Sequence, residues 1–213
     1  MKNKNYALAA AFMLLQAVSC TNATEKNTET QQKTQENAVP EAQVQVSDSL
    51  LSAQTKLVLT ALKAKDYQTL AGYIHPTLGV VFSPYSYIDT TKSVAFKAAT
   101  FVAQCQDKAL KTWGSYDGSG EPILLSAENY MKEFGYSADF LNADSLALNK
   151  TVAKGNSLNN IKEAFGGCYF TESYFAGKNP KFNGMDWSSL RLVYKLYENK
   201  LYLVAIVHNQ WTT

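Results

Sequence analysis

The strongest constraint on the fold lies near the C-terminus, where two runs of alternating apolar residues flank the dipeptide Glu198-Asn199. Alternation with a period of two is typical of half-buried strands. Asparagine tolerates the positive φ that a two-residue turn requires. We therefore predict a long β-hairpin in which residue 197 pairs with 200, 194 with 203 and 191 with 206.

This pairing makes one face of the hairpin wholly apolar. That face consists of Leu190, Leu192, Tyr194, Leu196, Leu201, Leu203, Ala205 and Val207. The other face is mixed and carries Arg191, Tyr202, Ile206 and His208. A slip of one residue would mix the two sets, so burial of the apolar face should determine the register.

Two amphipathic helices are predicted upstream, and they need a surface to cover. Ser47 and Asp48 are good N-caps for the first. Its apolar residues recur at helical spacing: Leu50, Leu51, Leu57, Val58, Ala61 and Leu62. Asp66 can cap a second, shorter helix that ends at His75-Pro76, because the residue before proline avoids the helical region. We expect both helices to pack on the apolar face of the hairpin.

The middle of the chain contains shorter elements. Residues 79–82 and 168–175 are strand candidates, and 126–134 and 157–165 are short helix candidates. Residues 101–106 are ambiguous between helix and strand, and 113–122 form a turn-rich stretch. Helices first and strands afterwards indicate an α+β fold rather than a βαβ alternation.

The N-terminus has the organisation of an export signal. Lys2 and Lys4 precede an apolar stretch from residue 6 to 18, which is short for a membrane span. Ala17, Ser19 and Cys20 then resemble a bacterial lipobox, in which Cys20 is lipidated and becomes the new N-terminus. Ala17 and Ser19 would also suit an ordinary signal-peptidase site that cuts the same bond.

A polar segment follows at residues 21–47, with no aromatic residue, leucine or isoleucine. Such a segment cannot bury enough apolar area to offset its chain entropy. We therefore divide the chain into a lipoprotein signal peptide (1–19), a disordered tether (20–47) and one folded domain (48–213). The expected location is the bacterial cell envelope, with the lipid anchor in a membrane, at the outer membrane or the cell surface.

Charge and composition exclude several classes of function. The net charge of +2 includes Lys2 and Lys4, so the expected mature chain is balanced, which argues against nucleic-acid binding. No apolar run, the signal stretch included, reaches the length of a membrane-spanning helix, which excludes a multi-pass membrane protein. No phosphate-binding glycine loop or nucleophile-elbow motif is present.

The order of elements resembles the NTF2-like (cystatin-like) cone fold. The strings that carry this resemblance are ALKAKDYQTLAGYIHP, HPTLGVVFSPY, WGSYDGSGEPI, MDWSSLRLVY and LYLVAIVHNQWT. The last four also look like segments of bacterial lipoproteins and secreted proteins with no assigned reaction. The resemblance implies a curved antiparallel sheet wrapped around N-terminal helices, with a pocket. The superfamily contains isomerases, dehydratases and binding modules, so the fold does not choose among these activities.

Three polar residues are candidates for catalysis: His75, His208 and Arg191, the only arginine. In the predicted register Arg191 is opposite Ile206 and diagonal to His208, so the two could bind an anionic group together. The alternatives are structural. Each histidine could end an element by hydrogen bonding, and Arg191 could pair with Asp186 or another carboxylate. Two histidines without nearby ligands do not make a metal site, and no cofactor is expected.

The remaining candidates are cysteines and aromatic residues. Cys105 and Cys168 could form a disulfide in an oxidising compartment, or remain as buried free thiols. Trp113, Tyr116 and Tyr202 are candidates for lining a pocket. Other aromatic side chains near the domain middle could join them or cover the sheet edge: Tyr85, Tyr87, Tyr130 and Trp187.

Three hypotheses for function follow. The first is a lipid-anchored domain that binds a small ligand or an envelope protein without catalysis. The second is a small pocket enzyme of the isomerase or dehydratase type that uses histidine and arginine. The third is an interaction protein that forms a homodimer through its sheet. An enclosed pocket that holds a histidine or a carboxylate with a perturbed pKa would favour the enzyme. A pocket without such a group would favour the binding module, and an exposed apolar sheet face the dimer.

Overall fold

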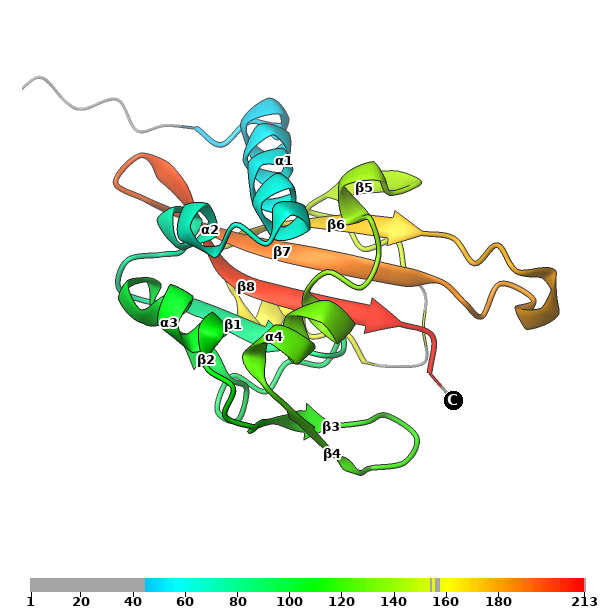
Figure 1. The fold of residues 1–213 in the computed structure, drawn as a ribbon. Coiled ribbons are helices and arrows are strands. Elements are labelled where there is room, and N and C mark those ends of the chain that lie inside the picture. Colours follow the sequence, from blue (N-terminus) through cyan, green and yellow to red (C-terminus); the bar gives the residue numbers. More distant parts are fainter. Residues whose placement is uncertain (1–44, 154, 156–157, 213) are drawn as a thin grey trace, which may run out of the picture. The chain divides into compact units, whose positions relative to one another are not determined.

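The computed structural model describes residues 45–153, 155 and 158–212, and the predictions for the signal peptide, Cys20 and most of the tether lie outside this part. The domain is α+β, with helices packed against a mixed six-stranded sheet in the order β2-β1-β8-β7-β6-β5 (Figure 1). These strands are β1 (Val80–Ser83), β2 (Ala95–Phe96), β5 (Ser145–Leu148), β6 (Tyr169–Phe175), β7 (Ser188–Tyr197) and β8 (Lys200–Gln210).

All neighbouring strands run antiparallel except β1 and β8, which are parallel. The expected antiparallel arrangement is therefore confirmed at every pair of neighbouring strands in this sheet except this one. A parallel neighbour requires a long connection, and here the chain between β1 and β8 contains most of the domain. A separate two-stranded sheet is formed by β3 (Lys111–Ser115) and β4 (Pro122–Leu125), which lie at the two ends of the turn-rich stretch 113–122 and extend beyond it.

The predicted hairpin is confirmed at its turn. Glu198 and Asn199 both have positive φ, of 46° and 59°, as a type I′ turn requires. Residue 197 pairs with 200 and 194 with 203, as expected. Leu192 and Leu203 consequently lie in the same core cluster.

Beyond Leu203 the predicted register is wrong, because β8 contains a β-bulge. Tyr194 pairs with Leu203 but Val193 pairs with Ala205, so Val204 is the extra residue. A bulge places two residues of one strand opposite one residue of its partner. After the bulge, each side chain of β8 therefore points to the face of the sheet opposite to the one predicted. Arg191 pairs with Val207 rather than Ile206.

The bulge exchanges side chains between the two faces. Ile206 belongs to the core cluster on the helix face, whereas Ala205 and Val207 belong to the cluster on the opposite face. The expectation that Ala205 and Val207 continue the face of Leu192 is therefore wrong. Alternation alone did not reveal the bulge because every residue from 203 to 207 is apolar.

The first two helices begin where their caps predict. In α1 (Asp48–Ala64) the Ser47 hydroxyl accepts a hydrogen bond from the backbone N–H of Leu50 at 3.2 Å. In α2 (Tyr67–Tyr73) the Asp66 carboxylate accepts from the N–H of Thr69 at 3.0 Å. These bonds satisfy backbone donors that the first helical turn leaves without partners.

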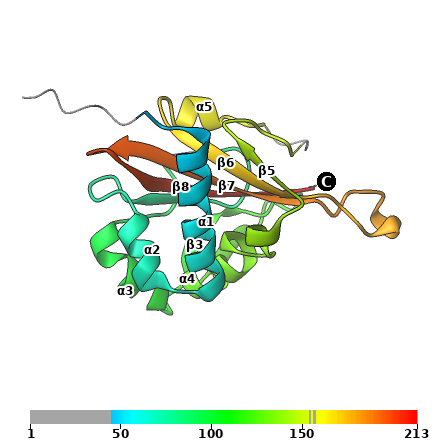
Figure 2. The same ribbon diagram turned by 90° about the horizontal axis from the view of Figure 1, so that it is seen from above.

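Helix α1 lies across the sheet and buries one face against it (Figure 2). Leu51, Val58 and Leu62 are buried. Leu50 and Leu57 are 36 % and 48 % exposed, so their assignment to the packing face is wrong. A buried hydroxyl contact also joins helix and sheet, since the oxygens of Thr55 and Thr171 are 3.1 Å apart.

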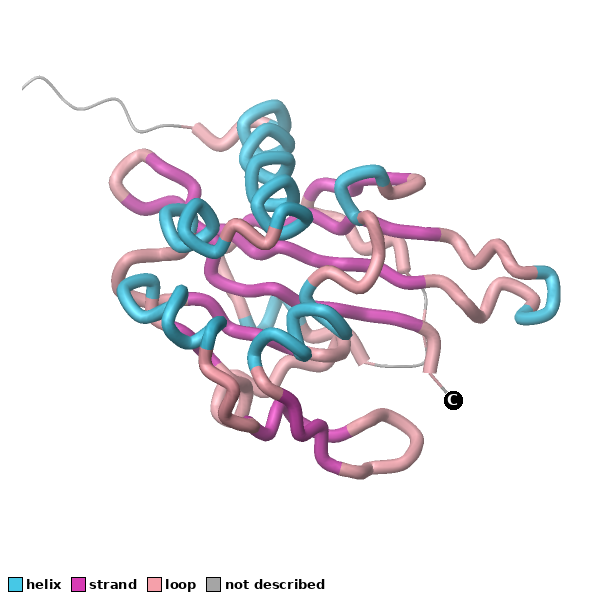
Figure 3. Tube along the Cα trace, viewed as in Figure 1, coloured by secondary structure: helices cyan, strands magenta, loops and turns pink. Residues whose placement is uncertain are grey.

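Three more short helical segments complete the layer on this face. Residues 101–106 form a helix, α3 (Phe101–Gln106), which resolves the ambiguity of the sequence. Ser126 caps α4 (Ala127–Tyr130), which continues into the π-helical segment η2 (Met131–Gly135). Single 3₁₀ turns are η1 (Ala98–Thr100), η3 (Phe140–Asn142) and η4 (Pro180–Phe182). Figure 3 shows the helices in cyan beside the magenta strands, with η4 at the tip of the long loop between β6 and β7, away from this layer.

The other face of the sheet is covered as well. Its cluster contains Phe170, Val193 and Val204, packed against Ile88 and Ile161 from two connecting segments. Ile161 begins the short helix α5 (Ile161–Ala164), which is shorter than the 157–165 helix we expected. The side chain of Asn160 joins the two segments, accepting from the N–H of Ile88 at 2.8 Å and donating to its carbonyl at 2.9 Å.

Candidate functional site

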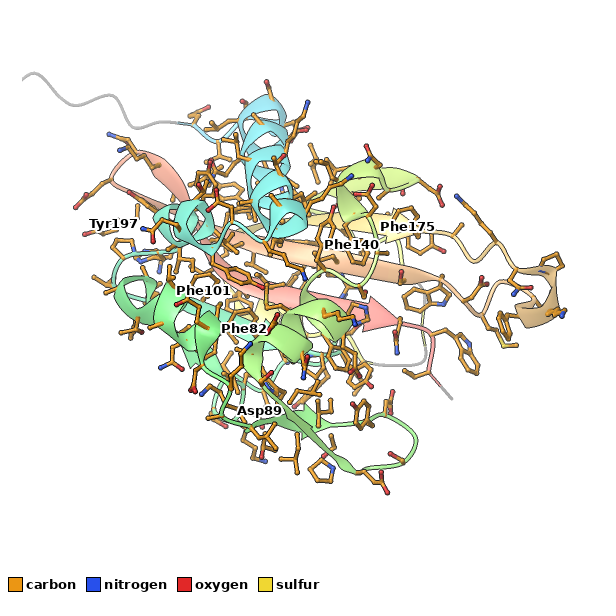
Figure 4. The ribbon with its side chains drawn as sticks, in the orientation of Figure 1. Phe82, Asp89, Phe101, Phe140, Phe175 and Tyr197 are labelled. Atoms are coloured by element: carbon orange, nitrogen blue, oxygen red, sulfur yellow. The ribbon has the colours of Figure 1, made fainter. Side chains whose placement is uncertain are left out.

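The best candidate site is an open cleft of about 700 Å³ beside the β3–β4 sheet. Most of its walls come from two segments, residues 83–93 after β1 and residues 113–117 of β3 and its turn. We call this space the aromatic cleft. It is lined by Ser83, Pro84, Tyr85, Tyr87, Asp89, Lys92, Ser93, Trp113, Gly114, Ser115, Tyr116, Asp117, Leu158 and Thr212. Figure 4 labels Asp89 on the side of the domain where β3 and β4 lie.

Two tyrosines of the aromatic cleft are held by one buried phenylalanine. The rings of Tyr85 and Tyr116 pack against Phe134 of η2, with centroids 6.0 and 6.3 Å away. Both tyrosines are half-buried. Tyr87 differs from them because it is 57 % exposed. The cleft therefore combines two supported rings with one that faces solvent.

Trp113 lies deepest among the aromatic residues of the cleft, at 3 % exposed. Its ring stacks on Tyr130 with centroids 3.8 Å apart, and it meets Phe82 edge-on at 5.6 Å. The indole N–H donates to the carbonyl of Leu125 at 2.9 Å, across the β3–β4 sheet. This side chain is fixed in place by core packing and a hydrogen bond.

Several polar groups of the cleft already have partners. The Tyr116 hydroxyl donates to Glu133 at 3.0 Å, and burial together with this carboxylate raises the pKa of Tyr116. The Ser83 hydroxyl donates to the carbonyl of Tyr85 at 2.8 Å. Hydrogen bonds from Thr91 lower the pKa of Asp89, which also lies 3.6 Å from the ammonium of Lys92. The lining thus holds two carboxylates and one ammonium.

Arg191 is not part of the aromatic cleft. It is 1 % exposed and its Nε donates to Oε1 of the fully buried Glu172 at 2.9 Å. The same oxygen accepts from the hydroxyl of Ser189 at 2.7 Å, and Nη1 of Arg191 donates to Ser86 at 3.2 Å. The structural alternative for Arg191 is confirmed, with Glu172 as its partner rather than Asp186.

His208 lies on the opposite face of the sheet from Arg191, because the bulge makes it the partner of Leu190. Its Nδ1 donates to the carbonyl of Pro84 at 3.2 Å, and its Nε2 lies 3.2 Å from the hydroxyl of Ser137. Burial lowers the pKa of His208 to about 4. The predicted pairing of Arg191 with His208 on one face is therefore wrong, and His208 is neutral near pH 7.

His75 is also buried, at the end of α2. Its Nδ1 accepts hydrogen bonds from the N–H groups of Thr77 and Leu78 at 3.3 and 3.2 Å. Its ring packs near Tyr197 and Tyr202, with centroids 4.9 and 5.9 Å away. His75 closes a turn, and Tyr202, a predicted pocket residue, belongs to this group and not to the aromatic cleft.

Both cysteines of the described domain are free. Cys105 belongs to the cluster on the helix face, whereas Cys168 packs against the cluster on the other face. The two thiols therefore lie in separate cores. They form no disulfide with each other, and the alternative of free thiols is confirmed. Burial raises the pKa of Cys105 to about 12, so its thiol is not a nucleophile near neutral pH.

Within residues 45–153, 155 and 158–212, no three histidine, cysteine or carboxylate side chains are grouped as a metal site would require. In the same part of the chain, no helix has both the length and the hydropathy needed to cross a bilayer.

The sequence indicated part of this site. Trp113 and Tyr116 do lie together in the cleft, and so do Tyr85 and Tyr87, whereas Tyr130 is packed beneath Trp113. Glu172 was missed because its partners lie on other strands and segments. The residues around Glu172, CYFTESYF, contain no feature that distinguishes a buried carboxylate from an exposed one.

Comparisons with known proteins find only distant structural similarity. No family model and no curated protein matches the chain. Among solved structures, a DUF4783 family protein from Bacteroides ovatus is 13 % identical, with a TM-score of 0.32 over 74 % of this chain and 94 % of that one. A designed NTF2-like protein is 11 % identical, with a TM-score of 0.29 over 76 % and 97 % of the two chains.

Proposed function

We propose that this protein is a binding module that holds a small ligand or a segment of a partner in the aromatic cleft, without catalysis. The single observation that carries the proposal is the cleft itself, about 700 Å³ in volume and lined by four aromatic side chains. Ligand sites are concave, largely apolar and equipped with a few polar groups, and a volume of this size is typical of them.

The positions of the two histidines and the arginine favour binding over the enzyme hypothesis, which relied on these three residues. An acid–base site needs a titratable group within hydrogen-bond reach of a bound substrate. His75 is occupied by backbone donors, His208 is enclosed between Pro84 and Ser137, and Arg191 is neutralised by Glu172. None of the three lines the aromatic cleft.

The proposal is tested by screening a diverse fragment library against the protein labelled for NMR. Binding in the cleft should shift the backbone amide signals of Tyr87, Gly114 and Ser115. Ser115→Trp should abolish these shifts, because a large ring would fill the open space beside an exposed strand residue. Hits that map elsewhere on the domain, or hits unaffected by Ser115→Trp, would refute the assignment of this site.

The proposal includes an envelope location with a lipid on Cys20. It rests on the N-terminal sequence, where a basic and apolar signal precedes Cys20 and a polar segment follows it. Mass spectrometry of the protein from bacterial membranes should find acyl chains on Cys20. Cys20→Ser should release the protein from the membrane fraction. Recovery of the unmodified wild-type protein in the soluble fraction would contradict this part.

A homodimer through the sheet stays a prediction and is not part of the proposal. Both faces of the sheet are covered by helices or connecting segments. A dimer that uses the sheet would therefore have to pair an edge strand, β2 or β5.

A further inference from the structure

We infer that the ligand of the aromatic cleft is an uncharged carbohydrate, which rests on the proposed function of that cleft. The inference comes from the polar groups that the cleft still offers, the shape of its aromatic surface and the near balance of its charges. Each of these features restricts the chemistry of the ligand in a different way.

Three side-chain hydroxyls of the cleft have no side-chain partner in the described part of the chain. No side-chain hydrogen bond joins the hydroxyls of Ser93, Ser115 or Thr212 to another residue of the described chain, and all three line the cleft. The Tyr85 hydroxyl accepts from the N–H of Asp117 at 3.3 Å, so its own hydrogen can still be donated. A hydroxyl both donates and accepts, and a ligand rich in hydroxyls is its natural complement.

The aromatic surface suits a ligand with one apolar face. Tyr85 and Tyr116 are held against Phe134, so they are preorganised and lose little side-chain entropy on binding. Tyr87 exposes 57 % of its surface and is free to stack. Aromatic rings combine a large apolar area with a polar tip. A sugar ring has the same character, with C–H bonds on its faces and hydroxyls around its rim.

The charges of the cleft argue against an anionic ligand. The lining contains one ammonium, that of Lys92, whose side chain is 86 % exposed and lies near Asp89. The chain's one arginine is buried elsewhere with Glu172. Phosphate and carboxylate recognition depends on bidentate arginine or on clustered cations. A nucleotide, a sulfated glycan or an acidic peptide would therefore find a single counter-charge here, that of Lys92, which already lies beside Asp89.

An extended peptide is the alternative ligand. Strand β3 has no strand partner on its second side in the described part of the chain, and Trp113, Gly114 and Ser115 line the cleft. A peptide could add to such an edge through backbone hydrogen bonds. We favour the carbohydrate because the ladder of β3 is irregular between Thr112 and Ser115, at the residues that a peptide would have to pair with.

The inference is tested by isothermal titration of the purified domain with a panel of neutral oligosaccharides of α and β linkage. Tetra- to hexasaccharides of glucose, galactose, mannose and N-acetylglucosamine should be included. Extended hexapeptides and a sulfated oligosaccharide serve as comparison ligands. At least one neutral oligosaccharide should bind, and its affinity should change less than about twofold between low and high salt, because no ion pair is formed.

Variants then locate the bound sugar. Tyr87→Ala should weaken binding by about tenfold or more, whereas Tyr87→Phe, which keeps the ring, should stay within about threefold. The matched control is Phe182→Ala, since Phe182 is 50 % exposed but lies outside the cleft. This control should bind as the wild type does. Thermal unfolding of each variant checks that the fold is kept.

The outcomes separate this inference from the proposed function. Peptide binding in the cleft without sugar binding would overturn the carbohydrate assignment and leave the binding module intact. Fragments in the cleft with no neutral sugar bound would do the same. A sugar that binds Tyr87→Ala as tightly as the wild type would also overturn the inference. An empty cleft in the fragment screen would refute the proposed function itself.

Discussion

Burial gives His208 an ionisation behaviour unlike that of a surface histidine. The pKa of its imidazole falls from 6.5 to about 4 in the folded domain because the charged form would lose its hydration. The unfolded chain therefore takes up a proton at a higher pH than the folded chain does. The contribution of neutral His208 to the free energy of unfolding is therefore fully present above pH 6.5. It is lost as the pH falls through the window from 6.5 to 4.

We predict that acid lowers the free energy of unfolding by about 3 kcal/mol over this window, at about 1.4 kcal/mol per pKa unit. His75, whose pKa is also lowered by burial and by Lys195, adds to the effect. Urea unfolding at a series of pH values measures the slope. His208→Gln should flatten it, and a variant with the wild-type slope would show that His208 is not its main source.

The Glu172–Arg191 pair is the second residue-scale feature, and its two charges are 0 % and 1 % exposed. Removing one partner of a buried pair leaves the other charged and without its counter-ion. Glu172→Gln should cost about 3–5 kcal/mol in urea unfolding. The double variant Glu172→Gln with Arg191→Met should recover part of this loss, because no buried charge remains.

An exposed ion pair provides the control for this experiment. Lys63 and Asp139 lie 2.6 Å apart with both side chains more than 40 % exposed. Lys63→Met should therefore cost less than about 1 kcal/mol. Equal losses from Glu172→Gln and Lys63→Met would contradict the role assigned to burial.

In the hairpin β7–β8, turn chemistry determines the pairing near Glu198-Asn199, and burial determines the pairing beyond the bulge. Its turn places Glu198 at φ 46°, a conformation that asparagine tolerates and β-branched residues do not. Glu198→Val should destabilise the domain by about 1–2 kcal/mol, whereas Glu198→Asn should be neutral or slightly stabilising. Thermal unfolding ranks the variants, and a Val variant as stable as Asn would contradict the turn geometry.

Capping and turn residues made the ends of α1, α2 and the hairpin predictable, because such signals depend on neighbours in the chain. The bulge at Val204 had no comparable signal. The bulge allows β8 to pack against segments that lie elsewhere in the chain. Ile206 and His208 pack on the helix side of the sheet, whereas Ala205 and Val207 belong to the cluster of Ile88 and Ile161. The parallel pairing of β1 with β8 is equally non-local.

In the described domain the six-stranded sheet separates two hydrophobic cores. Neighbouring residues of one strand belong to different cores. Leu192 belongs to the core on the helix side and Val193 to the core on the other side. Because both cores share the same strands, neither can be lost without the other. The domain should therefore unfold in a single cooperative transition.

We predict that Leu192→Ala and Val193→Ala both lower the midpoint of the same transition. Leu192→Ala should cost about 2–5 kcal/mol. Val193→Ala should cost less, because fewer buried methyl groups are removed. Far-ultraviolet and near-ultraviolet circular dichroism should give coincident urea curves for each variant. Two separate transitions in either variant would show that the two cores unfold independently.

The sequence by itself determined the α+β class, the helix starts at Ser47 and Asp66, the turn at Glu198-Asn199 and the grouping of Leu192 with Leu203. These follow from periodicity and from capping and turn chemistry, which act between residues close in the chain. Only the tertiary structure decided the partner of Arg191, the separation of Arg191 from His208, and the aromatic cleft. Those features join segments as far apart as residues 83–93, 113–117 and 212, and the free energy of their burial depends on contacts that no local pattern specifies.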